Sequence, residues 1–163
     1  MKKILKKPLW LTVITTLCLV VASLFSAYSC NKTENTLPNY PVKIPFTEYS
    51  LAGTFCQWTN LNYDDKIIVI NSNKKLASYI NCLEGNYPEI DFSKHTLLLA
   101  SGTTPNGIVE ISNRLLQLSA NEYKLDIKIL LNEAEVIGKW ITVLIVNKLN
   151  EESDIELVTI LRH

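Results

Sequence analysis

Histidine is scarce in this sequence, and its scarcity limits the chemistry that the chain could perform. Only two of the 163 residues are histidine, His95 and His163. A serine–histidine–acid site would have to use one of them, and no Gly-x-Ser-x-Gly motif is present to display a serine nucleophile. We interpret His95 as a polar residue at the start of a strand and His163 as a frayed terminal residue. We therefore expect no catalytic residue and no enzymatic activity.

Motifs for cofactors and metals are missing as well. The sequence has no phosphate-binding loop, no dinucleotide-binding fingerprint and no Cys-x-x-Cys pair. Residues 150–154 lack the glycine of a calcium-binding loop. The clustered carboxylates fall in expected turns, where solvent exposure explains them better than the acid–base pair of a glycosidase: Asp64, Asp65, Glu133, Glu135, Glu151, Glu152, Asp154 and Glu156. We expect neither a metal nor a cofactor.

The chain also lacks a surplus of positive charge. It contains 16 basic and 16 acidic residues. Four of the basic residues are lysines within residues 1–29, where there is no acidic residue, so 12 basic residues face 16 acidic ones in residues 30–163, a net charge of −4. Binding to nucleic acid and electrostatic docking on anionic lipid both need clustered Lys and Arg. The composition argues against both kinds of partner.

The beginning of the chain has the organisation of a secretory signal: a basic start, an apolar run over residues 9–25 and small residues before Cys30. With Ala27 at −3 and Ser29 at −1, it resembles a bacterial lipoprotein signal. That resemblance implies a signal peptide over residues 1–29, cleavage before Cys30, and acyl chains such as palmitate on Cys30. Two alternatives remain open, namely an uncleaved membrane helix and an ordinary secretory signal with a nearby cysteine.

The region after Cys30 has the composition of a tether. Two acyl chains hold a protein stably at a membrane, since each buried methylene contributes about 0.8 kcal/mol. Residues 30–43 contain Pro38, Pro41 and three asparagines but few apolar side chains, which is typical of a flexible linker. Residues 44–163 are long enough for one globular domain with one core.

Two of the four cysteines remain after this assignment. Cys18 would leave with the signal peptide and Cys30 would carry the lipid, which leaves Cys56 and Cys82. In an oxidising compartment these two are expected to pair, closing a loop of about 27 residues for roughly 3.5 kcal/mol in the chain-entropy account. Two separate buried thiols are the alternative. Without a nearby histidine the pair cannot complete a tetrahedral zinc site.

Hydrophobic patterning predicts an α+β domain that is mostly antiparallel sheet. One helix of about ten residues is expected to begin after the capping residues 71–73 and to end near Cys82. Residues 123–131 alternate between apolar and polar side chains, as in a strand with one buried face. A turn or exposed loop is expected over residues 102–107. Further strands are predicted at residues 66–71, 96–100, 107–112, 114–119, 140–146 and 155–161. Whether the sheet forms a sandwich or a partial barrel is left open.

Aromatic residues offer one further candidate for binding. Trp58 and Tyr63 flank an asparagine-rich stretch that could present rings to a sugar or a peptide. The alternative is that the rings around Phe55 and Trp58 cap the core beside the disulfide. We favour the core, because large aromatic side chains gain most from burial. Trp140 is expected in the core.

One part of the chain resembles known families. It comprises Pro-Glu-Ile-Asp-Phe-Ser-Lys-His at residues 88–95, the following apolar strand and the loop of residues 102–108. It resembles small lipoproteins of gut Bacteroidetes and, more distantly, the C-terminal domain of PrcB, an accessory subunit of a spirochaete surface protease complex. Pro105, Asn106, Gly107 and Ile108 depart from the Pro-Thr-Gly-Gly-Tyr-like loop of that domain. The resemblance implies a non-catalytic extracytoplasmic module and transfers no catalytic residue.

These observations predict a lipid-anchored binding module of the cell envelope, on the periplasmic or surface face of the outer membrane. The alternative is an accessory subunit or inhibitor of an exported protease. We expect contact with an envelope protein or protease through Pro105, Asn106 and Gly107, or through an open sheet edge by strand addition.

Overall fold

The computed structural model describes residues 39–163. Cys30 and most of the predicted linker lie outside the described residues. Strands make up 52% of this part of the chain and helix 4%, so the mostly antiparallel α+β prediction is confirmed. The described strands form two four-stranded sheets and a two-stranded ribbon, which is a sandwich rather than a closed barrel. Within residues 39–163 no helix has the length and apolar character to cross a membrane.

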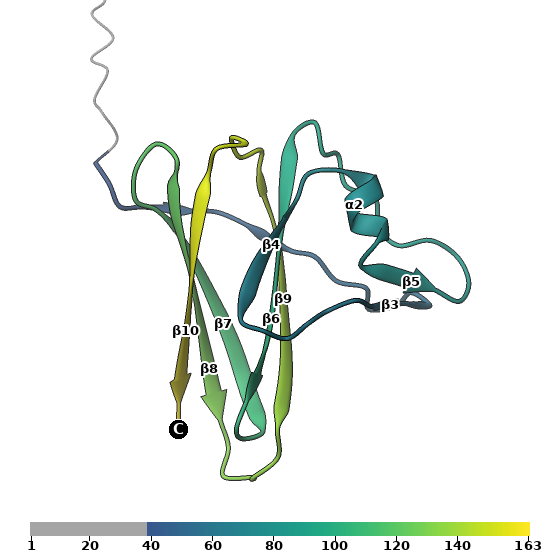
Figure 1. The fold of residues 1–163 in the computed structure, drawn as a ribbon, viewed down its shortest axis with the longest axis vertical. Helices are drawn as coiled ribbons and strands as arrows, with labels where there is room; N and C mark the ends of the chain where they lie inside the picture. Colours follow the sequence, from purple (N-terminus) through teal and green to yellow (C-terminus); the bar gives the residue numbers. More distant parts are fainter. Residues whose placement is uncertain (1–38) are drawn as a thin grey trace, which may run out of the picture. The chain divides into compact units, whose positions relative to one another are not determined.

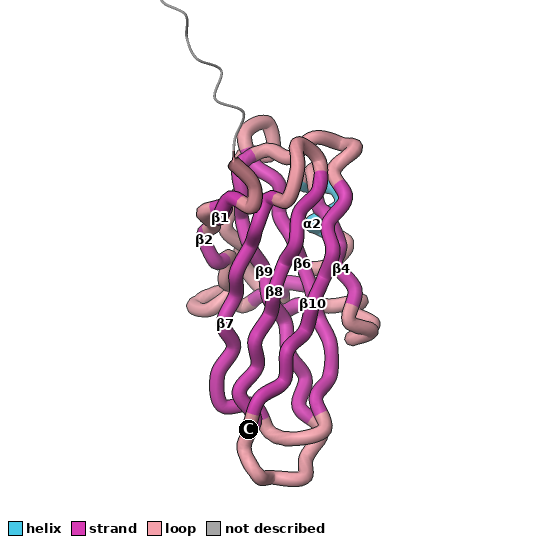
Figure 2. The backbone as a smooth tube through the Cα atoms, turned by 90° about the vertical axis from the view of Figure 1, so that its left-hand side faces the viewer, coloured by secondary structure: helices cyan, strands magenta, loops and turns pink. Residues whose placement is uncertain are grey.

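The two sheets face each other (Figures 1 and 2). The first sheet has the strand order β1 (Val42–Ile44), β7 (Ile108–Gln117), β8 (Glu122–Leu131) and β10 (Asp154–Arg162). The second sheet has the order β2 (Thr47–Glu48), β9 (Gly138–Asn147), β6 (His95–Thr104) and β4 (Lys66–Ile70). β8 and β10 pair in parallel, whereas every other described pair is antiparallel. The parallel pair arises because the chain crosses to the second sheet as β9 between them.

A first core lies between the two sheets. The alternation predicted for residues 123–131 is present, because Leu125, Ile127, Ile129 and Leu131 are all buried on the inner face of β8. Trp140 of β9 lies in the same core, as predicted. Its indole packs on Gly102, where an added Cβ would lie 2.6 Å from the Trp140 ring. Glycine at position 102 thus makes room for the largest side chain of this core.

A second core covers the outer face of the second sheet. It is closed by helix α2 (Asn73–Ala77) and by the ribbon of β3 (Cys56–Trp58) and β5 (Ile80–Cys82), which project from the sandwich in Figure 1. Leu97 and Leu99 of β6 face this layer, while Leu98 faces the first core. β6 is therefore buried on both faces, which explains its unbroken apolar sequence.

The predicted helix is half as long as expected. Ser72 caps it, with its hydroxyl accepting a hydrogen bond from the Lys75 amide at 3.3 Å, but α2 ends at Ala77. The predicted last turn is instead the strand β5, which pairs with β3. The prediction of a ten-residue helix was wrong because Tyr79 and Ile80 share helical spacing with Leu76, whereas a long-range strand pairing determines their conformation.

The boundaries of several strands also differ from the prediction. The two strands expected at residues 107–112 and 114–119 are one strand, β7, with a bulge between Ile108 and Glu110. Residues 102–104 belong to β6, so the predicted loop shrinks to Pro105–Gly107. Asp154 and Glu156 lie in β10 rather than in a turn. β1 includes Val42 and Lys43, which the sequence analysis assigned to the linker.

Candidate functional site

The predicted binding residues Pro105, Asn106 and Gly107 form the turn between β6 and β7. The Thr104 hydroxyl donates to the Asn106 carbonyl at 2.7 Å. The Gly107 amide and the Asn106 side chain both donate to the carbonyl of Ala134, at 3.1 and 3.3 Å. This turn is therefore fastened to the loop between β8 and β9, and only Pro105 of the three is fully exposed.

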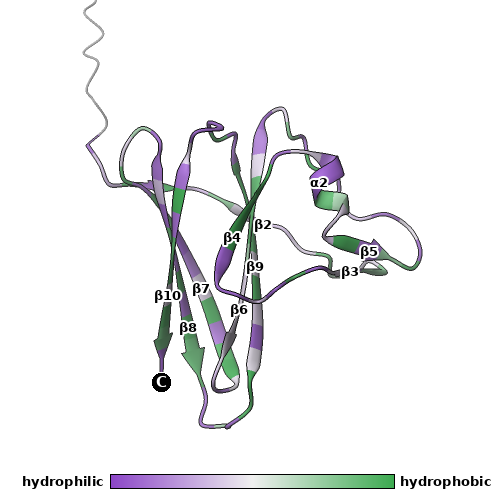
Figure 3. Cartoon of the chain, viewed as in Figure 1, coloured by the Kyte–Doolittle hydropathy of each residue, from purple (hydrophilic) through white to green (hydrophobic). Residues whose placement is uncertain are grey.

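Exposed apolar side chains occur at the same end of the sandwich as this turn. Val109 is 60% exposed, Val136 59% and Ile137 77%. We call this region the loop end, and define it by the turn Pro105–Gly107 together with Val109, Leu130, Val136, Ile137 and Leu161. The two loops and the end of β10 lie together beside the C terminus in Figures 1 and 2, and Figure 3 shows hydrophobic colour at the ends of β8 and β10. An exposed apolar cluster of this kind commonly marks an interaction site.

Sequence reasoning identified the turn but missed Val136 and Ile137. These two are an apolar pair in an otherwise polar stretch, between Glu135 and Gly138. That pair was a usable indication, because a solvent-exposed loop gains nothing from two adjacent large aliphatic side chains.

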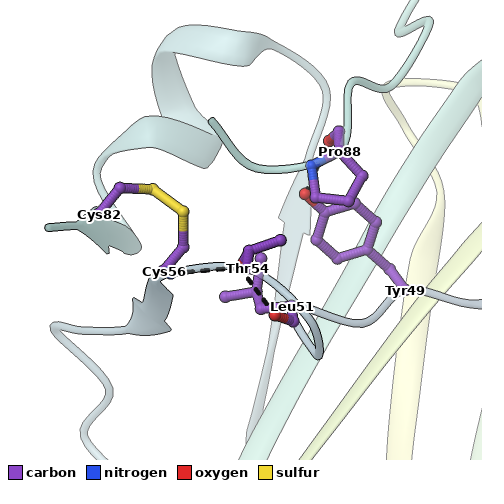
Figure 4. The surroundings of a disulfide bond; sticks show 6 residues. All are labelled: Tyr49, Leu51, Thr54, Cys56, Cys82 and Pro88. Atoms are coloured by element: carbon purple, nitrogen blue, oxygen red, sulfur yellow. Dashed lines mark hydrogen bonds between the residues drawn. A yellow bond between two sulfur atoms is a disulfide. The ribbon is translucent and has the colours of Figure 1, made fainter. Parts of the chain in front are cut away.

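The predicted disulfide between Cys56 and Cys82 is present, and the two cysteines are a directly opposed pair of the ribbon. Thr54 anchors the start of β3: its hydroxyl accepts from the Cys56 amide at 3.2 Å and donates to the Leu51 carbonyl at 2.7 Å (Figure 4). The bridge therefore joins the two strands of the ribbon, directly after a hydrogen-bonded turn.

The aromatic residues near the disulfide divide between core and surface. Trp58 is half-buried against the second core, with its ring edge-to-face with Tyr49 at a centroid separation of 6.0 Å. The capping interpretation thus holds for Trp58. Phe55 is 70% exposed and Leu83 is 82% exposed, and the Leu83 amide donates to the Phe55 carbonyl at 3.0 Å. This pair forms a small exposed apolar spot beside the disulfide.

A groove of about 300 Å³ runs along the side of the second sheet, where β2 leaves β9. We call it the edge groove, and it is lined by Glu48, Tyr49, Ser50, Leu51, Trp58, Ile111, Asn113, Ile141, Thr142 and Val143. The Thr142 hydroxyl donates to the Asn113 side chain at 3.3 Å, which links the two sheets at its floor. Sequence reasoning could not find this groove, because it depends on strand order.

The titratable groups have structural partners rather than a shared cleft. His95 is half-buried, and its Nδ1 lies 3.2 Å from the Asp91 carbonyl oxygen. Hydrogen bonds from Ser93, with help from Lys94, lower the pKa of Asp91 to about 2. Asp126 is 2% exposed and receives the Arg114 guanidinium, whose Nε donates at 3.0 Å. Within residues 39–163, no three His, Cys, Asp or Glu side chains converge as a metal site would require.

Comparison with known proteins adds no assignment. No family model, no curated protein and no solved structure matches the chain. The resemblance to Bacteroidetes lipoproteins and to PrcB stays a prediction, which rests on the residues quoted for it. The candidate site is therefore argued from geometry alone.

Proposed function

We propose that the protein is a lipid-anchored, non-catalytic binding module of the cell envelope that contacts a partner protein through the loop end. The observation that carries this proposal is that five exposed apolar side chains occur at the end of the sandwich that holds the fastened turn Pro105–Gly107. A stable monomer rarely exposes such a cluster unless something covers it.

The position of the loop end in the domain agrees with a tethered binder. The chain enters the sandwich at β1, where Val42 pairs with Gln117 at one end of β7. The loop end lies at the other end of β7, next to Ile108, which is nine residues from Gln117. At about 3.3 Å per residue, the two ends of that strand are about 30 Å apart. A tether ahead of β1 therefore joins the domain at the end of β7 opposite the loop end.

The rigidity of the loop end also suits recognition. Hydrogen bonds from Gly107 and Asn106 to Ala134 hold its two loops together. Binding by a preorganised surface loses little conformational entropy, so more of the apolar contact contributes to affinity. Ile137, Val109 and Val136 have the largest exposed fractions among the apolar side chains of the loop end.

The proposal is tested by photo-crosslinking in the membranes of cells that make the full-length protein. A photoreactive amino acid replaces Ile137, and in the control it replaces Ala120, an exposed residue of the β7–β8 turn. We expect one discrete adduct from position 137 and none from position 120. The double substitution V136S/I137S should abolish capture without changing the unfolding midpoint, because both side chains are exposed.

Gly107 is a poorer choice for substitution, since an added Cβ would lie 2.6 Å from the Asn132 side chain and would disturb the loop itself. Equal adducts from positions 137 and 120, or none from 137, would exclude the loop end as the contact surface. An adduct that proves to be an exported protease would make the module an accessory subunit or inhibitor of that enzyme.

A further inference from the structure

The edge of β9 is covered over only part of its length. β2 pairs with it through Thr47 and Glu48, opposite Ile145 and Leu144. The Tyr49 amide then donates to the Val143 carbonyl at 2.9 Å, and the chain turns away to the covering layer. No other described strand pairs with this side of β9, so its edge is open from Thr142 down to Gly138.

The open part of β9 presents backbone groups in a defined order. In an antiparallel sheet, alternate residues direct both their N–H and C=O toward the same neighbouring strand. Since the Val143 carbonyl points toward β2, the backbone groups of Ile141 and Lys139 point toward the same side. These are hydrogen-bonding groups without a strand partner, and the matching donors and acceptors belong to another extended backbone.

The edge groove lies along the open edge of β9, immediately beyond the end of β2. One wall comes from the first sheet, with Ile111 and Asn113 of β7. The other wall comes from the covering layer, with Leu51 and Trp58. A strand placed against Ile141 would direct alternate side chains to these two walls, because successive side chains of a strand point to opposite faces.

We propose that the edge groove binds an extended polypeptide segment, which adds as a strand to β9 beside Ile141. The side chains of the segment alternate between the wall of Ile111 and Asn113 and the apolar wall of Leu51 and Trp58. The chain's own strand β2 already pairs with β9 in this way, opposite Leu144 and Ile145 of the same edge. This second surface is separate from the loop end and stands whether or not the loop end has a partner.

An extended peptide fits the groove better than a compact small molecule does. A volume of about 300 Å³ is at the lower limit of small-molecule sites. Strand addition combines main-chain hydrogen bonds, which give affinity, with pockets for alternate side chains, which give specificity. The groove offers both, since its walls lie on either side of the open backbone.

The test uses a phage-displayed library of ten-residue linear peptides, selected on the full-length protein in detergent micelles. Enriched peptides should contain an apolar or aromatic residue at every second position. N-methylation of single peptide bonds should weaken binding at least tenfold at alternate positions and little at the positions between. That period of two distinguishes strand addition from side-chain docking, and it needs no change to the protein.

Two substitutions at neighbouring positions of β7 serve as the test variant and its matched control. N113K places a long side chain in the edge groove and should lower peptide affinity at least tenfold. S112K adds the same charge to an exposed residue, one position along β7 and on its other face, and should leave affinity unchanged.

Amide exchange should show new protection of Ile141 and Lys139 when the peptide binds. Protection of β10 instead of β9, equal effects of N113K and S112K, or failure to enrich any peptide would overturn the proposal. Any of these results would leave the crosslinking test of the loop end unaffected.

Discussion

At the scale of single residues, Tyr49 joins the sandwich to its covering layer. Its amide bonds to Val143 of β9, its ring packs edge-to-face on Trp58, and its hydroxyl donates to the Pro88 carbonyl at 2.8 Å (Figure 4). Burial, with a smaller contribution from the nearby Tyr87, raises the pKa of Tyr49 to about 12. A buried phenol that ionises would lose both its hydrogen bond and its favourable environment.

Tyr49→Phe should therefore change how stability depends on pH. The folded pKa lies above the ordinary value of about 10, so the neutral phenol contributes fully below pH 10, and its contribution is lost as pH rises toward 12. We expect Y49F to cost about 1 kcal/mol at pH 7 through the lost hydrogen bond, and to have a shallower loss of stability between pH 10 and 12. Urea unfolding across this range measures both effects.

Tyr63→Phe is the matched control for this experiment. Tyr63 is half-buried, and the Lys139 ammonium lies 4.9 Å from its ring centroid. Measuring Y63F over the same pH range separates the effect of Tyr49 from that of removing a tyrosine hydroxyl elsewhere. If Y49F and the wild type lose stability in parallel above pH 10, Tyr49 does not report the burial described here.

At the scale of elements, the ribbon of β3 and β5 depends on contacts outside itself. Each strand has three residues, and a two-stranded hairpin of this length is not stable alone in water. Trp58 and Ile80 insert into the second core, and the disulfide joins the opposite end. The ribbon in turn covers Leu97 and Leu99, so the second core and the bridge support each other.

Removing the disulfide should destabilise the protein through this element. The double substitution C56A/C82A opens a loop with a sequence separation of 26, for which the chain-entropy account gives about 3–4 kcal/mol. Chemical unfolding should show this loss, and wild-type protein in reducing agent should match the double variant. An unfolding midpoint unchanged by either treatment would mean that packing alone holds the ribbon.

The elements also show which features local sequence could predict. The alternation over residues 123–131 predicted the buried face of β8, because one side of that strand meets a core whatever its neighbours are. Helical spacing, by contrast, gave the wrong element for Ile80, whose pairing with Trp58 in β3 is a long-range contact. Alternation could not give the parallel pairing of β10 with β8 either, since it contains no information on strand direction.

The two candidate surfaces, the loop end and the edge groove, also differ in how far the local sequence could predict them. Turn chemistry at Pro105 and Gly107 was readable locally, and a turn is present there between β6 and β7. That Val109 and Ile137 lie at the same end of the sandwich follows from how β6, β7, β8 and β9 are ordered. The edge groove depends on β2 ending after two residues, which no local pattern indicated.

At the scale of the whole molecule, the proposed function requires the domain to be held at the envelope. The described domain contains no helix that could span a membrane. Residues 30–163 carry a net charge of −4, which does not favour docking on anionic lipid. The attachment proposed for this function is acylation of Cys30, which lies outside the described residues.

Acylation of Cys30 is tested by labelling cells with radioactive palmitate. The wild type should incorporate label, and its intact mass should correspond to a chain that begins at Cys30 and carries acyl groups. Cys30→Ala should lose the label and keep residues 1–29, because the resembled signal is cut only before a lipid-bearing cysteine. Cys18→Ala is the control and should label normally. A wild-type protein without label would instead favour the membrane helix or the secreted form, and the loop end would then need a partner that is not tied to one membrane.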